Sequence, residues 1–118
     1  MREPPAIDGF GGGGFRVAGV WRPGSLLILA DAPRDWRPLA VAELTLEDLE
    51  PVLNAPAGTV EFMLLGTGVQ QALPAGAVRE ALRRAGLGLE FMATDKAARL
   101  HNVLASEGRL FATALIAI

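Results

Sequence analysis

The segment Val60-Glu61-Phe62-Met63-Leu64-Leu65-Gly66-Thr67-Gly68 decides the fold of this chain. It joins a short apolar run to a Gly-x-Gly turn, and a helical pattern follows within a few residues. An apolar run that barely alternates with polar residues is typical of a strand buried on both faces of a parallel sheet. We therefore predict a strand over 60–65 and a turn at its carboxyl end, where ligands usually bind in α/β proteins.

Helices and strands alternate on both sides of this segment. Proline before a helix and glycine after it are typical helix borders, and a hydroxyl side chain is a typical N-cap. Thr45, with Asp48 three residues on, and Thr94 are the predicted caps. The predicted elements are helix 46–53, helix 75–85, strand 88–92, helix 94–107 and strand 110–118. Right-handed crossovers would place at least two of the strands parallel.

The first third of the chain has a β pattern. Alternating apolar residues and glycine-rich turns predict an antiparallel meander. Its strands are expected over 7–10, 15–20 and 25–30, joined by the glycines 11–14 and by a turn at 22–24, with a loop at 32–36. Trp21 and Trp36 fall in this part, and either core positions or the centre of a partner surface would suit them.

Composition excludes several classes of protein. A length of 118 residues, with 51% hydrophobic and 20% charged residues, predicts a single globular domain over residues 1–118. The net charge of −2 gives no reason to expect nucleic acid or an anionic membrane as partner. Without cysteine the chain has no disulfide, thiolate metal site or Cys nucleophile. No apolar run approaches the roughly 20 residues of a membrane span, and the stretch 1–5 is unlike a signal peptide, so we expect a cytoplasmic protein.

The turn Gly66-Thr67-Gly68 is a candidate site for an anion or a nucleotide, because glycines let backbone N–H groups approach a phosphate. Position 71, where a dinucleotide motif has its third glycine, is Gln71, and no lysine of the Walker type follows. The simpler interpretation is a tight turn that requires positive φ. Both interpretations stay open at this point.

His101 is the only imidazole of the chain and a candidate general base. A base needs a nucleophile, and no motif surrounds the available hydroxyls, so a buried histidine with a local hydrogen bond is the simpler interpretation. Together with Thr94 and Asn102 it could complete a pocket above the Gly66-Thr67-Gly68 turn. One histidine and no carboxylate pair at ligand spacing predict no metal site, and we expect no cofactor.

Several segments, in their order along the chain, resemble one family of unknown function, whose mitochondrial member is the NADH dehydrogenase (complex I) assembly factor three. They are Gly13-Gly14-Phe15-Arg16-Val17, Gly24-Ser25-Leu26-Leu27, Leu64-Leu65-Gly66-Thr67-Gly68, Asn102-Val103-Leu104 and Glu107-Gly108-Arg109. The resemblance covers essentially the whole chain. It implies a three-layer α/β domain, in which a mixed central sheet has helices on one face and a small antiparallel β layer on the other. Members commonly carry Tyr-Asn where this chain has His101-Asn102.

The resemblance also implies a function without catalysis. We expect a protein-interaction or assembly-factor-like module that binds another protein, which is expected to be membrane-associated. A homodimer is a further expectation, because C₂ dimers are the commonest soluble assemblies. The alternative is a small-ligand binder or enzyme, with its site formed by Gly66, Thr67 and Gly68 and completed by Thr94, His101 and Asn102.

Overall fold

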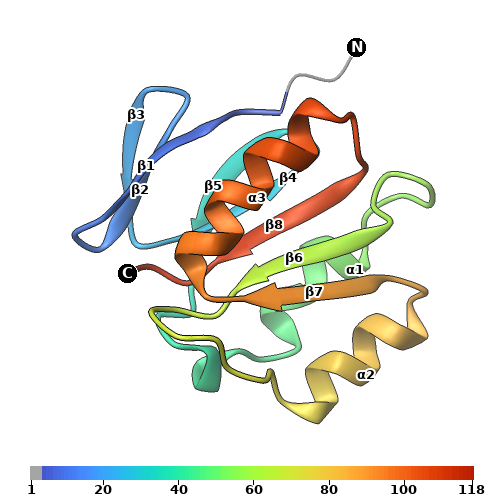
Figure 1. Cartoon of the computed structure of the whole chain (residues 1–118). Helices are drawn as coiled ribbons and strands as arrows, with labels where there is room; N and C mark the ends of the chain where they lie inside the picture. Colours follow the sequence, from blue (N-terminus) through green and yellow to red (C-terminus); the bar gives the residue numbers. More distant parts are fainter. Residues whose placement is uncertain (1–3) are drawn as a thin grey trace.

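The computed structural model describes residues 4–118 and contains two β-sheets with helices around the larger one (Figure 1). Residues 1–3, part of the stretch compared above with a signal peptide, lie outside the described residues. The small sheet is antiparallel, in the order β1 (Ile7–Gly11), β2 (Gly14–Val17) and β3 (Val20–Pro23). The larger sheet has the order β5-β4-β8-β6-β7, formed by β4 (Ser25–Leu29), β5 (Ala32–Trp36), β6 (Phe62–Gly66), β7 (Gly88–Met92) and β8 (Phe111–Leu115).

The larger sheet is mixed. β6 pairs in parallel with both β7 and β8, whereas β4 pairs antiparallel with β5 and β8. The last strand of the chain, β8, is therefore central, and all five of its residues are buried. Burial on both faces explains why β6 and β8 show little alternation in the sequence. The predicted parallel pairing is confirmed.

Helices connect the parallel strands. α2 (Gly76–Arg84) follows β6, and α3 (Thr94–Ser106) joins β7 to β8. The predicted helices 75–85 and 94–107 and the strand 88–92 agree with these elements within one residue at each end. Periodicity and glycine borders were sufficient to predict these elements, because both helices have a regular apolar stripe and a glycine lies beside or at an end of each element.

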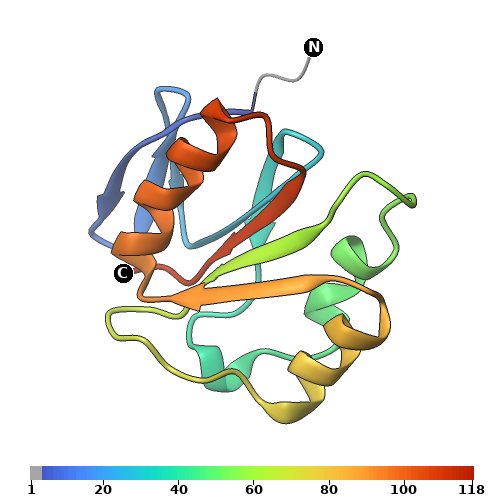
Figure 2. The same ribbon diagram turned by 45° about the vertical axis from the view of Figure 1, so that its right-hand side comes forward.

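Two apolar cores lie on opposite faces of the larger sheet. Along β6, Met63 and Leu65 point into one core, with Val78 and Leu82 of α2, whereas Leu64 points into the other. The second core combines α3 with the inner face of the small sheet and has as members Ile7, Phe15, Val17, Leu26, Ile28, Ala97, Ala98, Leu104, Phe111 and Leu115. The molecule therefore has three layers, with the larger sheet in the middle (Figure 2).

The predicted α/β class, with a mixed central sheet and a separate antiparallel β layer, is confirmed. The prediction that all helices share one face is wrong, because α3 lies on the face of the small sheet and α2 on the opposite face. The apolar stripe of α3, which includes Ala97 and Ala98, packs mainly on β6. It leaves the same face of β4 to be covered by Phe15 and Val17 of the small sheet.

The N-terminal meander is confirmed, but it has more turns than predicted. The predicted strand 15–20 is two strands, because Ala18 and Gly19 form a hairpin turn with φ of 49° and 80°. The predicted loop 32–36 is strand β5, reached through a second such turn at Ala30 and Asp31, with φ of 52° and 63°. Two successive positive φ values suit the right-handed twist of a two-residue hairpin. Alanine rarely adopts positive φ, and its presence at the first position of each turn hid both turns in the sequence.

The predicted helix 46–53 is shorter and divided. A 3₁₀ turn, η2 (Glu47–Leu49), precedes the single α-turn α1 (Glu50–Leu53), with Pro51 in its first turn. A further 3₁₀ turn, η1 (Val41–Glu43), lies just upstream. The backbone N–H and the hydroxyl of Thr45 both donate to Asp48 Oδ2 at 2.9 Å. The hydroxyl of Thr45 therefore serves the Asp48 carboxylate and does not cap the helix as predicted.

Candidate functional site

The Gly66-Thr67-Gly68 turn lies where β6 ends, against the start of α3 and the residues after β8. Gly66 is opposite Met92 on one side and Leu115 on the other. A Cβ atom at Gly66 would be 2.8 Å from Leu115 Cδ2 and 2.9 Å from Thr94 Oγ1, which is too close for any side chain. Glycine is required here so that helix α3 can begin directly on the strand. Gly68 is required for a different reason, its φ of 110°.

Thr94 joins three segments of backbone at this point. Its N–H donates to Gly68 O at 2.8 Å, and its Oγ1 accepts the Gly68 N–H at 2.9 Å. The hydroxyl proton goes to Ile116 O at 2.8 Å. Thr94 is fully buried and is the first residue of α3, whose N-cap is Ala93 without a side-chain bond. The prediction that Thr94 caps its own helix is therefore wrong, because its hydroxyl serves the neighbouring strand ends instead.

Thr67 organises the loop that follows. Its N–H donates to Met92 O at 2.8 Å, and its Oγ1 accepts the Ala72 N–H at 3.1 Å. The single hydroxyl proton serves Gln70 O, at 2.7 Å, or Met92 O, at 3.2 Å. The backbone amides of Thr67 and Gly68 are thus both hydrogen-bonded within the chain. Their present role is to fix the loop 67–75, and ligand binding at this turn stays a prediction.

His101 is a buried structural link. Its exposed fraction is 1%, and its ring lies edge-on to Phe111. Nε2 is 2.8 Å from Pro5 O, and since a carbonyl only accepts, Nε2 carries the proton. Nδ1 then accepts from the Thr113 hydroxyl at 2.7 Å. Burial lowers the pKa of His101, so the ring is neutral near pH 7.

Asn102 links α3 to the small sheet. Its Oδ1 accepts the Ile7 N–H at 2.9 Å, and its Nδ2 donates to Ile7 O at 2.8 Å. The side-chain amide therefore pairs with β1 in the way that a neighbouring strand would. The Asn-Val-Leu segment at 102–104 thus has a structural role in this chain, which is to hold the small sheet against the helix.

The six predicted site residues form two clusters. The turn residues Gly66, Thr67 and Gly68 meet Thr94, whereas His101 and Asn102 contact the N-terminal segment of the chain. His101 follows Thr94 by seven positions, which is about 10 Å along an α-helix. Within residues 4–118, no group of three or more metal-binding side chains is present. In the same range no helix is long and apolar enough to cross a membrane.

The loop after β6 carries two strongly exposed apolar side chains that the sequence patterns did not predict. Val69 is 78% exposed and Leu73 is 63% exposed, both in the loop that Thr67 fixes. We call these two residues the loop pair. The sequence does contain a signal for their exposure, because both are apolar residues in a stretch that shows neither helical nor strand periodicity. The loop lies at the end of the sheet where β6 and β7 finish (Figures 1 and 2).

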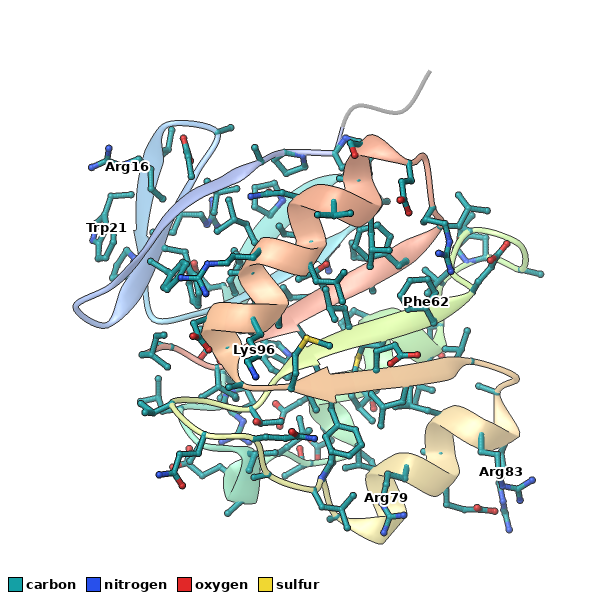
Figure 3. The ribbon with its side chains drawn as sticks, viewed as in Figure 1. Arg16, Trp21, Phe62, Arg79, Arg83 and Lys96 are labelled. Atoms are coloured by element: carbon teal, nitrogen blue, oxygen red, sulfur yellow. The ribbon has the colours of Figure 1, made fainter. Side chains whose placement is uncertain are left out.

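The two tryptophans, for which the sequence left two alternatives, have different positions. Trp36 is buried in the core on the α2 side of the sheet, and its Nε1 donates to Asp48 O at 3.1 Å. Trp21 is 48% exposed and projects with Arg16 from the outer face of the small sheet (Figure 3). A Cβ atom at Gly14 would lie 2.8 Å from the Trp21 ring, so this glycine makes room for it.

Comparison with known proteins gives relatives over nearly the whole chain. A family model described as "Protein of unknown function (DUF498/DUF598)" matches residues 7–116. An uncharacterised protein of Rhodobacter capsulatus is 43% identical, over 93% of this chain and 82% of its own length. NADH dehydrogenase [ubiquinone] 1 alpha subcomplex assembly factor 3 of Danio rerio is 30% identical, over 87% of this chain and 59% of its own length.

A solved structure has the same fold. It is described as an outer membrane protein from Bartonella henselae and superposes with a TM-score of 0.89 and 31% identity. The match covers 97% of this chain and 95% of that protein. The order of strands and helices is therefore shared with an experimentally determined relative.

Proposed function

Because the chain belongs to the DUF498/DUF598 family of proteins of unknown function, we propose that it is a non-catalytic protein-interaction module of the assembly-factor type. The observation that carries this proposal is the loop after β6. Its amide and hydroxyl groups at Thr67 and Gly68 bond within the chain, whereas Val69 and Leu73 face solvent. A loop held in this way presents an apolar surface that loses little conformational freedom when a partner covers it.

The partner that we propose is another protein. A relative bears the name of an assembly factor of NADH dehydrogenase, and a structural relative is described as an outer membrane protein. The first name supports a protein partner, and we propose that this chain meets a membrane-associated protein from the cytoplasm. Apolar side chains at the centre of such contacts contribute most of the binding energy when they are fully buried.

Replacing both members of the loop pair tests the proposal. The double substitution Val69→Asp and Leu73→Asp places charges where a partner would exclude water, so we expect binding to be lost while the fold is kept. The measurement is quantitative capture from a detergent-solubilised membrane lysate, using the tagged chain as bait. The double variant is compared with the unaltered chain.

Val103→Asp is the matched control, because Val103 is also apolar and 52% exposed but lies on α3. The proposal predicts a partner that the unaltered chain and the control both retain and the loop-pair variant loses. Equal retention by all three chains, or capture of no specific protein, would refute it. Light scattering of the purified chain shows separately whether the captured partner is a second copy.

A further inference from the structure

A hollow of about 350 Å³ lies at the other end of β6, away from the Gly-Thr-Gly turn. It is enclosed by the β4–β5 hairpin, by α1 and by the loop 54–60, which lie at the same end of the sheet (Figure 2). Its walls are mainly apolar and include Leu29, Pro51 and Val60. A volume in this range is enough for a small molecule, and apolar walls with a few polar groups are typical of ligand pockets.

Three residues with polar side chains line this hollow: Arg34, Asn54 and Thr59, and the Thr59 hydroxyl donates to Pro56 O. Arg34 is opposite Leu27 in the β4–β5 ladder, so its side chain lies on the face of the sheet that carries Leu27 and Leu29. Among residues 4–118, neither the Arg34 guanidinium nor the Asn54 amide makes a side-chain hydrogen bond or an ion pair. Arg34 is the only charged residue among those that line the hollow. The nearby acid Asp31 lines an adjoining hollow, which shares Ala30 and Thr59 with this one.

We propose that this hollow binds a small carboxylic acid with a short apolar tail. The guanidinium of Arg34 presents two parallel N–H donors, a geometry that matches the two oxygens of a carboxylate. The amide of Asn54, the C-cap residue of α1, can donate a further bond. The tail would then lie against Leu29 and Val60 and displace water from them. This site is independent of the loop pair, which is at the opposite end of β6.

Titrating the ¹⁵N-labelled chain with butanoate, pentanoate and hexanoate tests the proposal by NMR. We expect amide shifts confined to residues around the hollow. Each added methylene should tighten binding about two- to fourfold, since burying a methylene contributes up to about 0.8 kcal/mol. The uncharged analogue 1-hexanol should bind more weakly than hexanoate, because it cannot pair with Arg34.

The Arg34→Gln variant tests the contribution of the guanidinium to binding separately from that of the apolar walls. It should weaken hexanoate binding about tenfold and leave 1-hexanol binding unchanged, and an unaltered spectrum elsewhere shows that the variant is folded. Arg16→Gln is the control, because Arg16 also has no partner among residues 4–118 and lies on the small sheet. Binding that does not depend on Arg34, shifts located elsewhere, or no binding at tens of millimolar would each overturn the proposal.

Discussion

Asn102 and Thr94 show what single polar residues do in this chain. Each makes its side-chain hydrogen bonds with backbone groups far away in the sequence. Thr94 ties the turn after β6 to the residues after β8, and Asn102 ties β1 to α3. At this scale two residues of the resembling segments, Gly68 and Asn102, have a role in hydrogen bonding within the fold.

Asn102→Asp tests the structural role of the side-chain amide. The carboxylate keeps an acceptor for the Ile7 N–H, but it leaves Ile7 O without a donor and places a negative charge beside it. A partly buried carbonyl without its partner costs about 1–3 kcal/mol, so the free energy of unfolding in urea should fall by that amount. Ser106→Ala, which removes only an exposed bond to Val103 O, should change it by less than about 0.5 kcal/mol. Equal losses in the two variants would contradict this role.

The elements of the fold meet most closely where α3 begins on β6. Gly66 allows this contact, and Thr94 fills the space above it. The glycine at the start of α2, Gly76, has no such neighbour, since a Cβ atom there would only approach the Arg79 side chain at 3.7 Å. The two glycines are therefore unequal, although in the sequence both stand at the border of an element.

Alanine substitutions at Gly66 and at Gly76 test this difference between the two glycines. Gly66→Ala forces a Cβ atom against Leu115 and Thr94, so we expect a loss of about 1–3 kcal/mol in unfolding free energy. Gly76→Ala should instead raise it by about 0.4–1 kcal/mol, because alanine restricts the unfolded chain and fits a helix. Denaturant unfolding of both variants measures the two effects. A Gly66→Ala chain as stable as the parent would show that α3 moves without cost.

On the scale of the whole molecule, His101 connects three parts of the fold. It bonds to the segment before β1 through Pro5 and to β8 through Thr113, and it belongs to α3 itself. Its ring is buried in the neutral form, and burial lowers its pKa from the ordinary value of 6.5. The unfolded chain therefore binds a proton at His101 more readily than the folded chain does.

This linkage predicts how stability depends on pH. The free energy of unfolding should be level above about pH 7 and should decrease as the pH falls below about 6.5. The slope contributed by one histidine is at most about 1.4 kcal/mol per pH unit. Urea unfolding of the parent and of His101→Gln, between pH 7.5 and pH 5, isolates this contribution as the difference between the two curves. Parallel curves would mean that His101 titrates normally in the folded state.

Asp48 affects stability in a separate and lower pH range. Its carboxylate accepts two bonds from Arg37 and two from Thr45, and the Arg37 guanidinium is the main cause that lowers its pKa to about 2. A lowered carboxyl pKa contributes stability that is present above the ordinary value near 4 and is lost as the pH falls toward 2. The stability contributions of His101 and Asp48 therefore fall in different pH ranges and can be measured separately.

Local sequence patterns were sufficient to predict the strands and helices in the second half of the chain. Between 60 and 118, apolar periodicity together with proline and glycine borders predicted three strands, two helices and parallel pairing, because these signals arise within a few neighbouring residues. The hairpin turns at 18–19 and 30–31 were missed, since each has alanine at its first positive-φ position, where glycine, asparagine or aspartate is the usual signal.

The roles of the candidate residues were decided by tertiary contacts. Thr94, His101 and Asn102 were predicted as one ligand-binding set, but their partners lie at Gly68, Pro5 and Ile7. These hydrogen bonds join positions that are 26, 96 and 95 residues apart. A sequence pattern shows that a hydroxyl, an imidazole or an amide is present, whereas only packing of the sheets and helices brings a distant carbonyl within hydrogen-bonding distance of it.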